Sequence, residues 1–183
     1  MSQEQTARDT ARAVAPASAA MSAAPADSSA TERSSARWVV TPRGIGPVLA
    51  GMSIAELGTA LGEPVKPSYA AGSRCAYVRP TALPTDVFVM VQNDTVARVD
   101  VRGRGVLTAD SVGVGDAEAS VVTRYAGRVR TRPHKYTGPK GHYLTVSAPP
   151  DSSNLLMFET DGSTVVNYRA GRRSAVELSE GCS

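Results

Sequence analysis

The chain has 183 residues, a formal net charge of +3, and 20 Lys and Arg against 17 Asp and Glu. No apolar run approaches the roughly 18 residues of a membrane-spanning helix, so we expect a soluble protein. Two cysteines and two histidines, with no Cys-x-x-Cys pair, indicate neither a zinc nor a thioredoxin-like site. The sequence carries no catalytic, cofactor or metal motif, and we expect no enzymatic activity.

Residues 1–36 are rich in Ala, Ser and Thr and contain no aromatic residue. Such a segment cannot bury enough apolar surface to offset the entropy lost on ordering, so we expect a disordered tail or linker. Its alanine-rich stretch 14–26 is broken by Pro16 and Pro25 and does not predict a secretory signal. From Trp38 onward the composition becomes globular, which leaves about 145 residues for folded structure.

The two cysteines, Cys75 and Cys182, are widely separated in the sequence. A disulfide between them would close a loop of over a hundred residues and stabilise the fold by on the order of 4 to 5 kcal/mol. The alternative is a buried Cys75 and an incidental Cys182 at the terminus. We expect the bridge, and with it a periplasmic or secreted location, with a cytoplasmic location as the alternative.

Two short helical stretches show the same pattern when Gly51 is laid over Gly115. Apolar residues then coincide at both positions of an i, i+4 pair, which predicts one buried stripe on each helix. These residues are Leu57 with Val121 and Leu61 with Tyr125.

The ends of these helices are also marked in the sequence. Ser53 is the predicted N-cap of the first helix, with Glu56 three residues later as in a capping box. Asp116 is the matching cap in the second helix. Gly62 and Gly127 follow the helices, where a left-handed residue ends a helix favourably.

Two predicted β-hairpins match as well, residues 87–101 and residues 154–170, with two extra residues in the second turn. Each follows a shorter predicted strand, 76–79 or 143–147. The sequence therefore predicts an α+β fold of two tandem repeats, 37–106 and 107–183, each a short helical segment packed on an antiparallel sheet. The expected inward residues are Leu57, Leu61, Val89, Val91, Ala97, Val99, Val101, Val121, Leu156, Phe158, Val166, Tyr168 and Ala170.

The stretch "GMSIAELGTALGEP" resembles the Gly-Met-Ser/Thr-x-x-Glu-Val-x-x-x-Leu-Gly-x-Pro motif of small outer-membrane-assembly lipoproteins. These belong to the β-lactamase-inhibitor-protein-like superfamily. The matching residues are Gly51, Met52, Ser53, Glu56, Leu61, Gly62 and Pro64, whereas Leu57 replaces the valine. The resemblance implies a helical hairpin on one face of an antiparallel sheet, a unit that occurs twice in tandem in the inhibitor. It also implies the binding of proteins at the cell envelope.

If the helices cover one face of the sheet, side-chain parity predicts that the other face is open. Large apolar, methionine and arginine residues on such a face are typical of protein interfaces. We therefore expect a protein partner there; the alternative is that the two sheets or the tail cover this face within the molecule. Val96 and Val165 are among the residues predicted to lie on this open face. The residues predicted to contact the partner are Phe88, Met90, Arg98, Asp100, Met157, Asn167 and Arg169.

A second candidate surface is the arginine-rich strip, residues 124–142, which lies in a window without acidic residues from 119 to 150. A basic strip with interleaved aromatic rings would bind an anionic polymer, either nucleic acid or acidic polysaccharide. The alternative is a solvated edge strand kept soluble by its charge, which Pro133 favours. Its two histidines flank a turn and would approach one another there, but a third metal ligand is lacking. The residues of the strip are Arg128, Arg130, Arg132, His134, Lys135, Tyr136 and His142.

Overall fold

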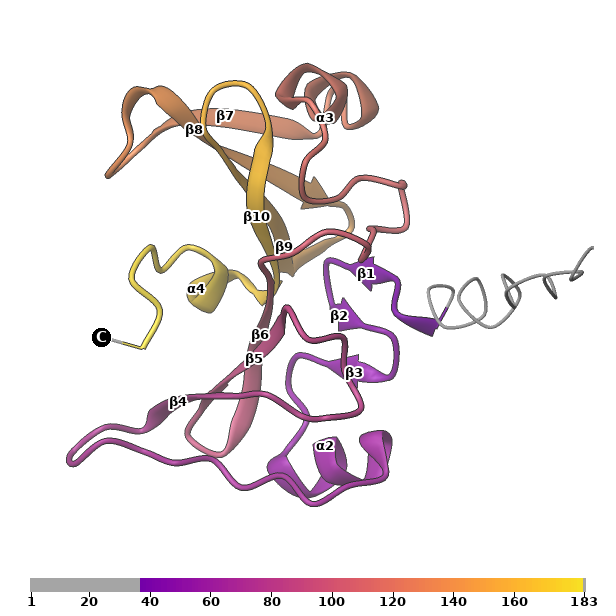
Figure 1. Cartoon of the computed structure of the whole chain (residues 1–183), viewed down its shortest axis with the longest axis vertical. Coiled ribbons are helices and arrows are strands. Elements are labelled where there is room, and N and C mark those ends of the chain that lie inside the picture. Colours follow the sequence, from indigo (N-terminus) through magenta and orange to yellow (C-terminus); the bar gives the residue numbers. More distant parts are fainter. Residues whose placement is uncertain (1–36, 183) are drawn as a thin grey trace, which may run out of the picture.

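The computed structural model describes residues 37–182, so the predicted tail 1–36 lies outside the described residues. The chain forms an α+β fold in which antiparallel strands predominate (Figure 1). Its strands are β1 (Val40–Thr41), β2 (Gly44–Ile45), β3 (Val48–Leu49), β4 (Cys75–Val78), β5 (Val87–Gln92), β6 (Thr95–Val101), β7 (Val129–His134), β8 (Gly138–Ala148), β9 (Asp151–Thr160) and β10 (Val165–Arg172). Its helices are α2 (Ile54–Leu61), α3 (Glu118–Arg124) and α4 (Arg173–Val176).

One seven-stranded sheet runs through the molecule in the order β4-β5-β6-β10-β9-β8-β7. Both predicted hairpins are present, and they join where β6 pairs antiparallel with β10, with Tyr168 opposite Val101. The two halves of the chain therefore contribute to a single sheet, whereas the sequence predicts a sheet for each half. The strip strand β7 lies at one edge of this sheet, as the edge-strand alternative predicts.

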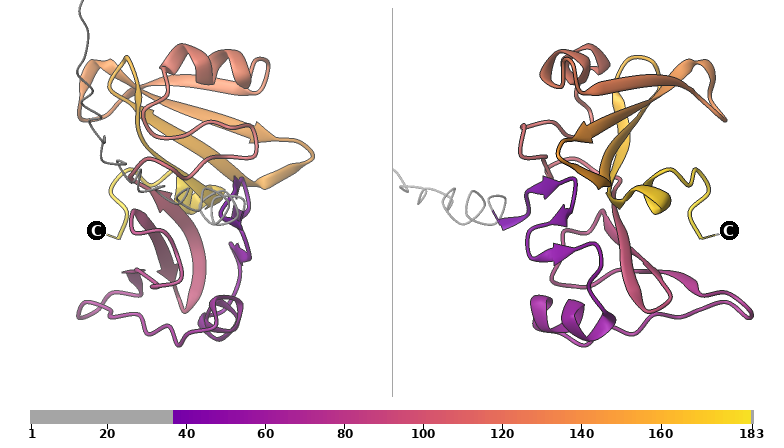
Figure 2. Two further views of the ribbon diagram at one scale, coloured as in Figure 1. Left: turned by 45° about the vertical axis from the view of Figure 1, so that its right-hand side comes forward. Right: turned by 180° about the vertical axis from the view of Figure 1, so that it is seen from behind.

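The two faces of the sheet are covered differently (Figure 2). Helices α2 and α3 and the small β1-β2-β3 sheet lie on one face, and α4 with the C-terminal residues lies on the other. A single apolar core lies on the first face and contains side chains of both helices and both hairpins, which include Leu57, Val89, Val99, Val121, Leu156, Phe158 and Tyr168. The helical hairpin implied by the family resemblance is not formed: in residues 37–106, α2 is the only helix of at least one full turn.

The sequence correctly identifies the cap of α2 but not that of α3. The Ser53 hydroxyl accepts a hydrogen bond from the Glu56 amide, and the Glu56 carboxylate accepts one from the Ser53 amide at 2.7 Å. Helix α2 ends at Gly62, whose φ of 74° favours glycine. In α3 the N-cap is Ala117, which has no side chain to cap the helix. The prediction for Asp116 is wrong, because its carboxylate accepts instead from the Gly113 amide at 2.8 Å.

Equivalent backbone hydrogen bonds tie the loop before each helix to the start of the second strand of its own hairpin. The Gly51 amide donates to the Val96 carbonyl at 2.8 Å, and the Gly115 amide donates to the Val165 carbonyl at 2.8 Å. In return, the Val96 amide donates to Met52 and the Val165 amide to Asp116, at 2.7 and 2.9 Å. The loops before the two helices thus have the same geometry despite their different sequences.

A β-bulge in each hairpin overturns part of the predicted side-chain parity. The register shifts between Met90 and Val91 opposite β6, and between Val165 and Asn167 within β10. Because a bulge inserts one extra residue into a strand, the side chains on one side of the bulge point to the opposite sheet face from the one that strict alternation predicts. Ala97 accordingly packs on the α4 side, and Val166 is 41% exposed, so the inward prediction is wrong for both. Their neighbours Val96 and Val165, predicted to lie on the open face, belong to the main core.

The unequal caps give a stability prediction. Ala117 has the extended backbone of an N-cap (φ −64°, ψ 138°), so Ala117→Ser should raise the free energy of unfolding by about 0.5 to 1 kcal/mol. Ser53→Ala should lower it by about 1 kcal/mol. Urea denaturation measures both changes. Ala119→Ser, inside α3, is the control and should give no gain, because serine is a poorer helix former than alanine. Equal effects of serine at 117 and 119 would contradict the assigned cap.

Candidate functional site

The sheet face that the sequence predicts to be open is covered by the protein itself. Helix α4 and residues 177–182, here called the cover segment (173–182), lie across β6, β9 and β10. Ala175 packs against Met90 and Ala97, and Val176 packs against Leu155 and Met157. The prediction of an open face is therefore wrong for the residues that the cover segment buries, which are Met90, Arg98, Asp100, Met157 and Arg169. The other two predicted contact residues, Phe88 and Asn167, are half-buried.

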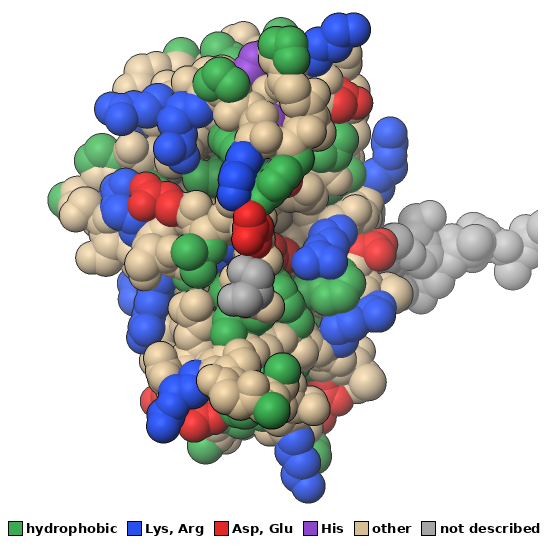
Figure 3. All heavy atoms as spheres, turned by 90° about the vertical axis from the view of Figure 1, so that its left-hand side faces the viewer, with side chains coloured by type: hydrophobic (Ala, Val, Ile, Leu, Met, Phe, Trp, Pro, Cys, Tyr) green, Lys and Arg blue, Asp and Glu red, His purple; other side chains and the backbone are tan. Residues whose placement is uncertain are grey.

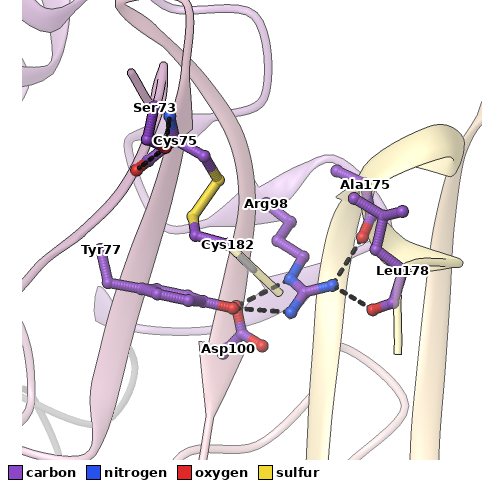
Figure 4. The surroundings of a disulfide bond; sticks show 8 residues. All are labelled: Ser73, Cys75, Tyr77, Arg98, Asp100, Ala175, Leu178 and Cys182. Atoms are coloured by element: carbon purple, nitrogen blue, oxygen red, sulfur yellow. Dashed lines mark hydrogen bonds and ion pairs between the residues drawn. A yellow bond between two sulfur atoms is a disulfide. The ribbon is translucent and has the colours of Figure 1, made fainter. Parts of the chain in front are cut away.

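Arg98 is the centre of the contact between the sheet and the cover segment (Figure 4). Its Nε donates to the Asp100 carboxylate at 3.0 Å, and the pair is almost fully buried. Nη1 donates to the carbonyl oxygens of Ala175 and Leu178 at 2.5 and 2.8 Å. Nη2 donates to the Tyr77 hydroxyl at 2.6 Å. A charged donor thus satisfies two main-chain carbonyls near the C-terminal end of α4, where a helix lacks internal partners.

Arg169 makes a similar contact from the next strand. Its Nε donates to the carbonyl oxygen of Val176 at 2.7 Å, and its Nη1 forms a buried ion pair with Glu159. Asn167 also donates to Glu159, at 2.9 Å, and His134 approaches the same carboxylate at 3.4 Å. Two buried arginines from neighbouring strands therefore hold three carbonyl groups of the cover segment, those of Ala175, Val176 and Leu178.

The acidic partners of these arginines have opposite pKa shifts. Burial alone would raise the pKa of Glu159, but Arg169, Asn167 and His134 together bring it below its ordinary value. Burial raises the pKa of Asp100, and Arg98 offsets this only in part. Burial, reinforced by Asp100, also raises the pKa of Tyr77, which stays a neutral phenol at physiological pH.

The end of the cover segment is attached by other contacts. The predicted disulfide is present: Cys182 is bonded to Cys75 on β4, with the two Cα atoms 5.3 Å apart. The Glu180 carboxylate accepts from Lys135 at 2.8 Å and from the Tyr136 hydroxyl. Between the sheet and residues 179–181 lies a polar cavity of about 360 Å³, lined on the sheet side by Tyr77, Arg98, Asp100, Arg102, Glu159, Asn167 and Arg169.

Beside the cover segment, three side chains form a cluster, here called the rim: Arg79 directly after β4, Phe88 on β5 and Arg102 directly after β6. The guanidinium groups of Arg102 and Arg79 lie 4.3 and 4.8 Å from the centre of the Phe88 ring. Both arginines are exposed. Lys and Arg side chains surround much of this face (Figure 3). Stacked arginine and aromatic groups are the side chains that contribute most at protein interfaces.

The arginine-rich strip is partly neutralised by acidic side chains. His134 approaches Glu159, Lys135 and Tyr136 bind Glu180, His142 pairs with Glu118 at 2.9 Å, and Arg128 lies 3.8 Å from Asp110. Within residues 37–182, four cations of the strip have no such ion pair, and all four are exposed: Arg124, Arg130, Arg132 and Lys140. The strip therefore presents separate unneutralised cations, with its other basic side chains beside acidic groups.

The two histidines do not approach one another. The His134 ring stacks on Tyr143, 4.3 Å between ring centres, on the α4 side of the sheet. His142 precedes Tyr143 in β8, points to the opposite face and meets Glu118 of α3. The described chain contains no group of three His, Cys, Asp or Glu side chains that could hold a metal ion. In the same residues, no helix is long and apolar enough to cross a membrane.

Sequence reasoning missed the cover segment and the rim. Residues 173–182 are short and mostly polar, so no periodic pattern marks them as packed against a sheet. The one available signal was Cys182, whose pairing with Cys75 requires the C-terminus to return to β4. The rim residues lie 9 to 23 positions apart in the sequence, and only the register of β4, β5 and β6 brings them together.

The chain matches no protein-family model, no curated protein and no solved structure.

The buried ion pair gives a prediction about stability. Arg98→Met leaves Asp100 buried without its cation, and should lower the free energy of unfolding by about 3 to 5 kcal/mol. The double variant Arg98→Met/Asp100→Leu removes the uncompensated charge and should recover part of this loss. Guanidinium denaturation of the three proteins measures the coupling. An equal loss in the single and double variants would show that the carbonyl bonds to the cover segment, and not the ion pair, carry the effect.

Glu159 gives a prediction about acid stability. Its folded pKa lies below the ordinary 4.5, so its contribution is fully present above that pH and is lost as the pH falls through the lower folded pKa. The free energy of unfolding of Glu159→Gln should therefore fall less steeply between about pH 4.5 and pH 3 than that of the unsubstituted chain. The raised pKa of Asp100 changes the pH dependence of stability in the opposite direction. This contribution is the same in both proteins, so it cancels when their acid slopes are compared. Identical acid slopes would contradict the role of Glu159.

Proposed function

We propose that this chain is a non-enzymatic binding module of the cell envelope or extracellular space, and that its partner is a protein. One observation carries the proposal: the sheet face already holds a polypeptide segment, through Arg98 and Arg169 bound to main-chain carbonyl oxygens. Main-chain carbonyls are common to all proteins, so arginine donors of this kind suit recognition of a polypeptide. The disulfide supports an oxidising compartment.

The rim is the part of this face that a partner would reach. Arg79, Phe88 and Arg102 combine two exposed cations with a large aromatic ring. Such a cluster fits an acidic segment of a partner, whose carboxylates would meet the guanidinium groups while apolar atoms contact Phe88. We therefore place the first contact of the partner at the rim, next to the cover segment, because the residues under that segment are buried while it is in place.

We also propose that the two halves of the chain descend from one duplicated unit of the β-lactamase-inhibitor-protein-like superfamily. The support is the motif around Gly51 and the equivalent hydrogen bonds from Gly51 and Gly115 to Val96 and Val165. Equivalent bulges at the start of β6 and β10 add to it. Protein binding by that superfamily is consistent with the proposed partner.

Binding of an anionic polymer is the second candidate. The observation that favours it is the pair of exposed arginines on the edge strand, Arg130 and Arg132, with the exposed Arg124 and Lys140 in the same strip. The other basic side chains of the strip lie beside acidic groups, which weakens its attraction for a polyanion.

The two candidates respond differently to charge reversal and salt. In a pull-down from envelope extract, Arg79→Glu/Arg102→Glu should abolish capture of the protein partner, whereas the matched control Arg130→Glu/Arg132→Glu should retain it. Both variants should melt within a few degrees of the unsubstituted chain, since the substituted side chains are exposed. Capture through the rim should persist at physiological salt. Loss of binding in the control variant, with affinity falling steeply from low to physiological salt, would favour the anionic polymer instead.

A further inference from the structure

The cover segment consists of two parts that are held in different ways. Helix α4 and Leu178 are fixed by buried arginines, which donate to the carbonyl oxygens of residues 175, 176 and 178. Residues 179–182, here called the flap, have no backbone hydrogen bond to the sheet within the described chain. The contacts that hold the flap include those of Glu180 with Lys135 and Tyr136, the packing of Cys182 against Met90, Ala97 and Ala175, and the disulfide at Cys182.

Of these flap contacts, the disulfide is the strong one. Lys135 and Glu180 are both more than half exposed, 57% and 53%, and an ion pair in that setting contributes little and is screened by salt. The disulfide, in contrast, fixes the end of the flap covalently to β4. Both cysteines are half-buried rather than enclosed.

Under the flap lies the polar cavity of about 360 Å³. Its sheet wall carries three arginines, Arg98, Arg102 and Arg169, against the two carboxylates of Asp100 and Glu159. The flap lies close against one wall of it: a Cβ built on Gly181 would lie 2.7 Å from the Tyr77 hydroxyl, and Gly181 has a φ of 69° that favours glycine. The groove beneath has an excess of cations and adjoins the rim through Arg102.

We propose that the Cys75–Cys182 disulfide is a latch that keeps the flap closed, and that its reduction by a dithiol opens the groove to an acidic segment of the partner. In that reaction the S–S bond between Cys75 and Cys182 breaks and both sulfurs become thiols. The dithiol supplies two electrons and two protons, and its own sulfurs join in a disulfide. The choice of an acidic segment rests on the proposed function, whereas the opening of the flap does not.

Nitrogen-15 relaxation of the full chain tests the latch without any partner. In the oxidised protein we expect amide order parameters of about 0.85 in both α4 and the flap. With dithiothreitol, residues 179–182 should fall below about 0.6, whereas residues 173–176 and the sheet stay at about 0.85. The variant Cys75→Ser/Cys182→Ser should show the open flap in both conditions. A flap that stays ordered after reduction would overturn the inference, as would loss of order throughout α4 and the sheet.

Peptide binding separates this inference from the proposed function. A fluorescein-labelled peptide of alternating Glu and Gly should bind the reduced chain at least tenfold more tightly than the oxidised chain, by fluorescence anisotropy. Equal binding in both states would contradict gating by the flap. If the flap opens by relaxation but the peptide binds in neither state, the latch stands and the proposed acidic partner is wrong.

Discussion

The guanidinium groups of Arg98 and Arg169 each have a carboxylate on the sheet as a partner, and they donate to two carbonyl oxygens and one carbonyl oxygen of the cover segment, respectively. A buried charge is costly unless all of its hydrogen-bonding capacity is used, so neither arginine could lie in this position without the segment above it. The same contacts satisfy the carbonyl groups at the end of a four-residue helix that would not be stable alone. Sheet and cover segment therefore depend on one another.

Much of the architecture follows from local pattern. The capping box at Ser53, the i, i+4 apolar pairs and the alternation in both hairpins placed the main helices and strands, because these elements bury one face at a regular spacing. The two-residue strands of the β1-β2-β3 sheet were missed, since strands of that length have no period to detect. The prediction that Ala97 and Val166 face inward is wrong for a different reason. A bulge is set by pairing with the neighbouring strand, which the sequence of one strand does not encode.

The candidate site was less predictable than the fold. Parity correctly placed Arg98, Met157 and Arg169 together on the face away from α2 and α3, but could not show that other residues of the chain cover that face. Contacts such as Arg98 with Ala175 join positions 77 residues apart. Only the cysteine pair pointed to the return of the C-terminus, and it indicated one end of the segment without its path.

The two edges of the sheet restrict how a partner can be recognised. At one edge β4 has only four residues, and at the other β7 carries Pro133, which lacks an amide donor, between the exposed Arg130, Arg132 and Lys135. Neither edge is a good template for a further strand from another chain. Recognition by strand addition, in which backbone amides and carbonyls provide most of the affinity, is therefore disfavoured. A partner of the kind proposed above would instead be selected by side chains next to the cover segment, where single substitutions can change the contact without altering the strands that present them.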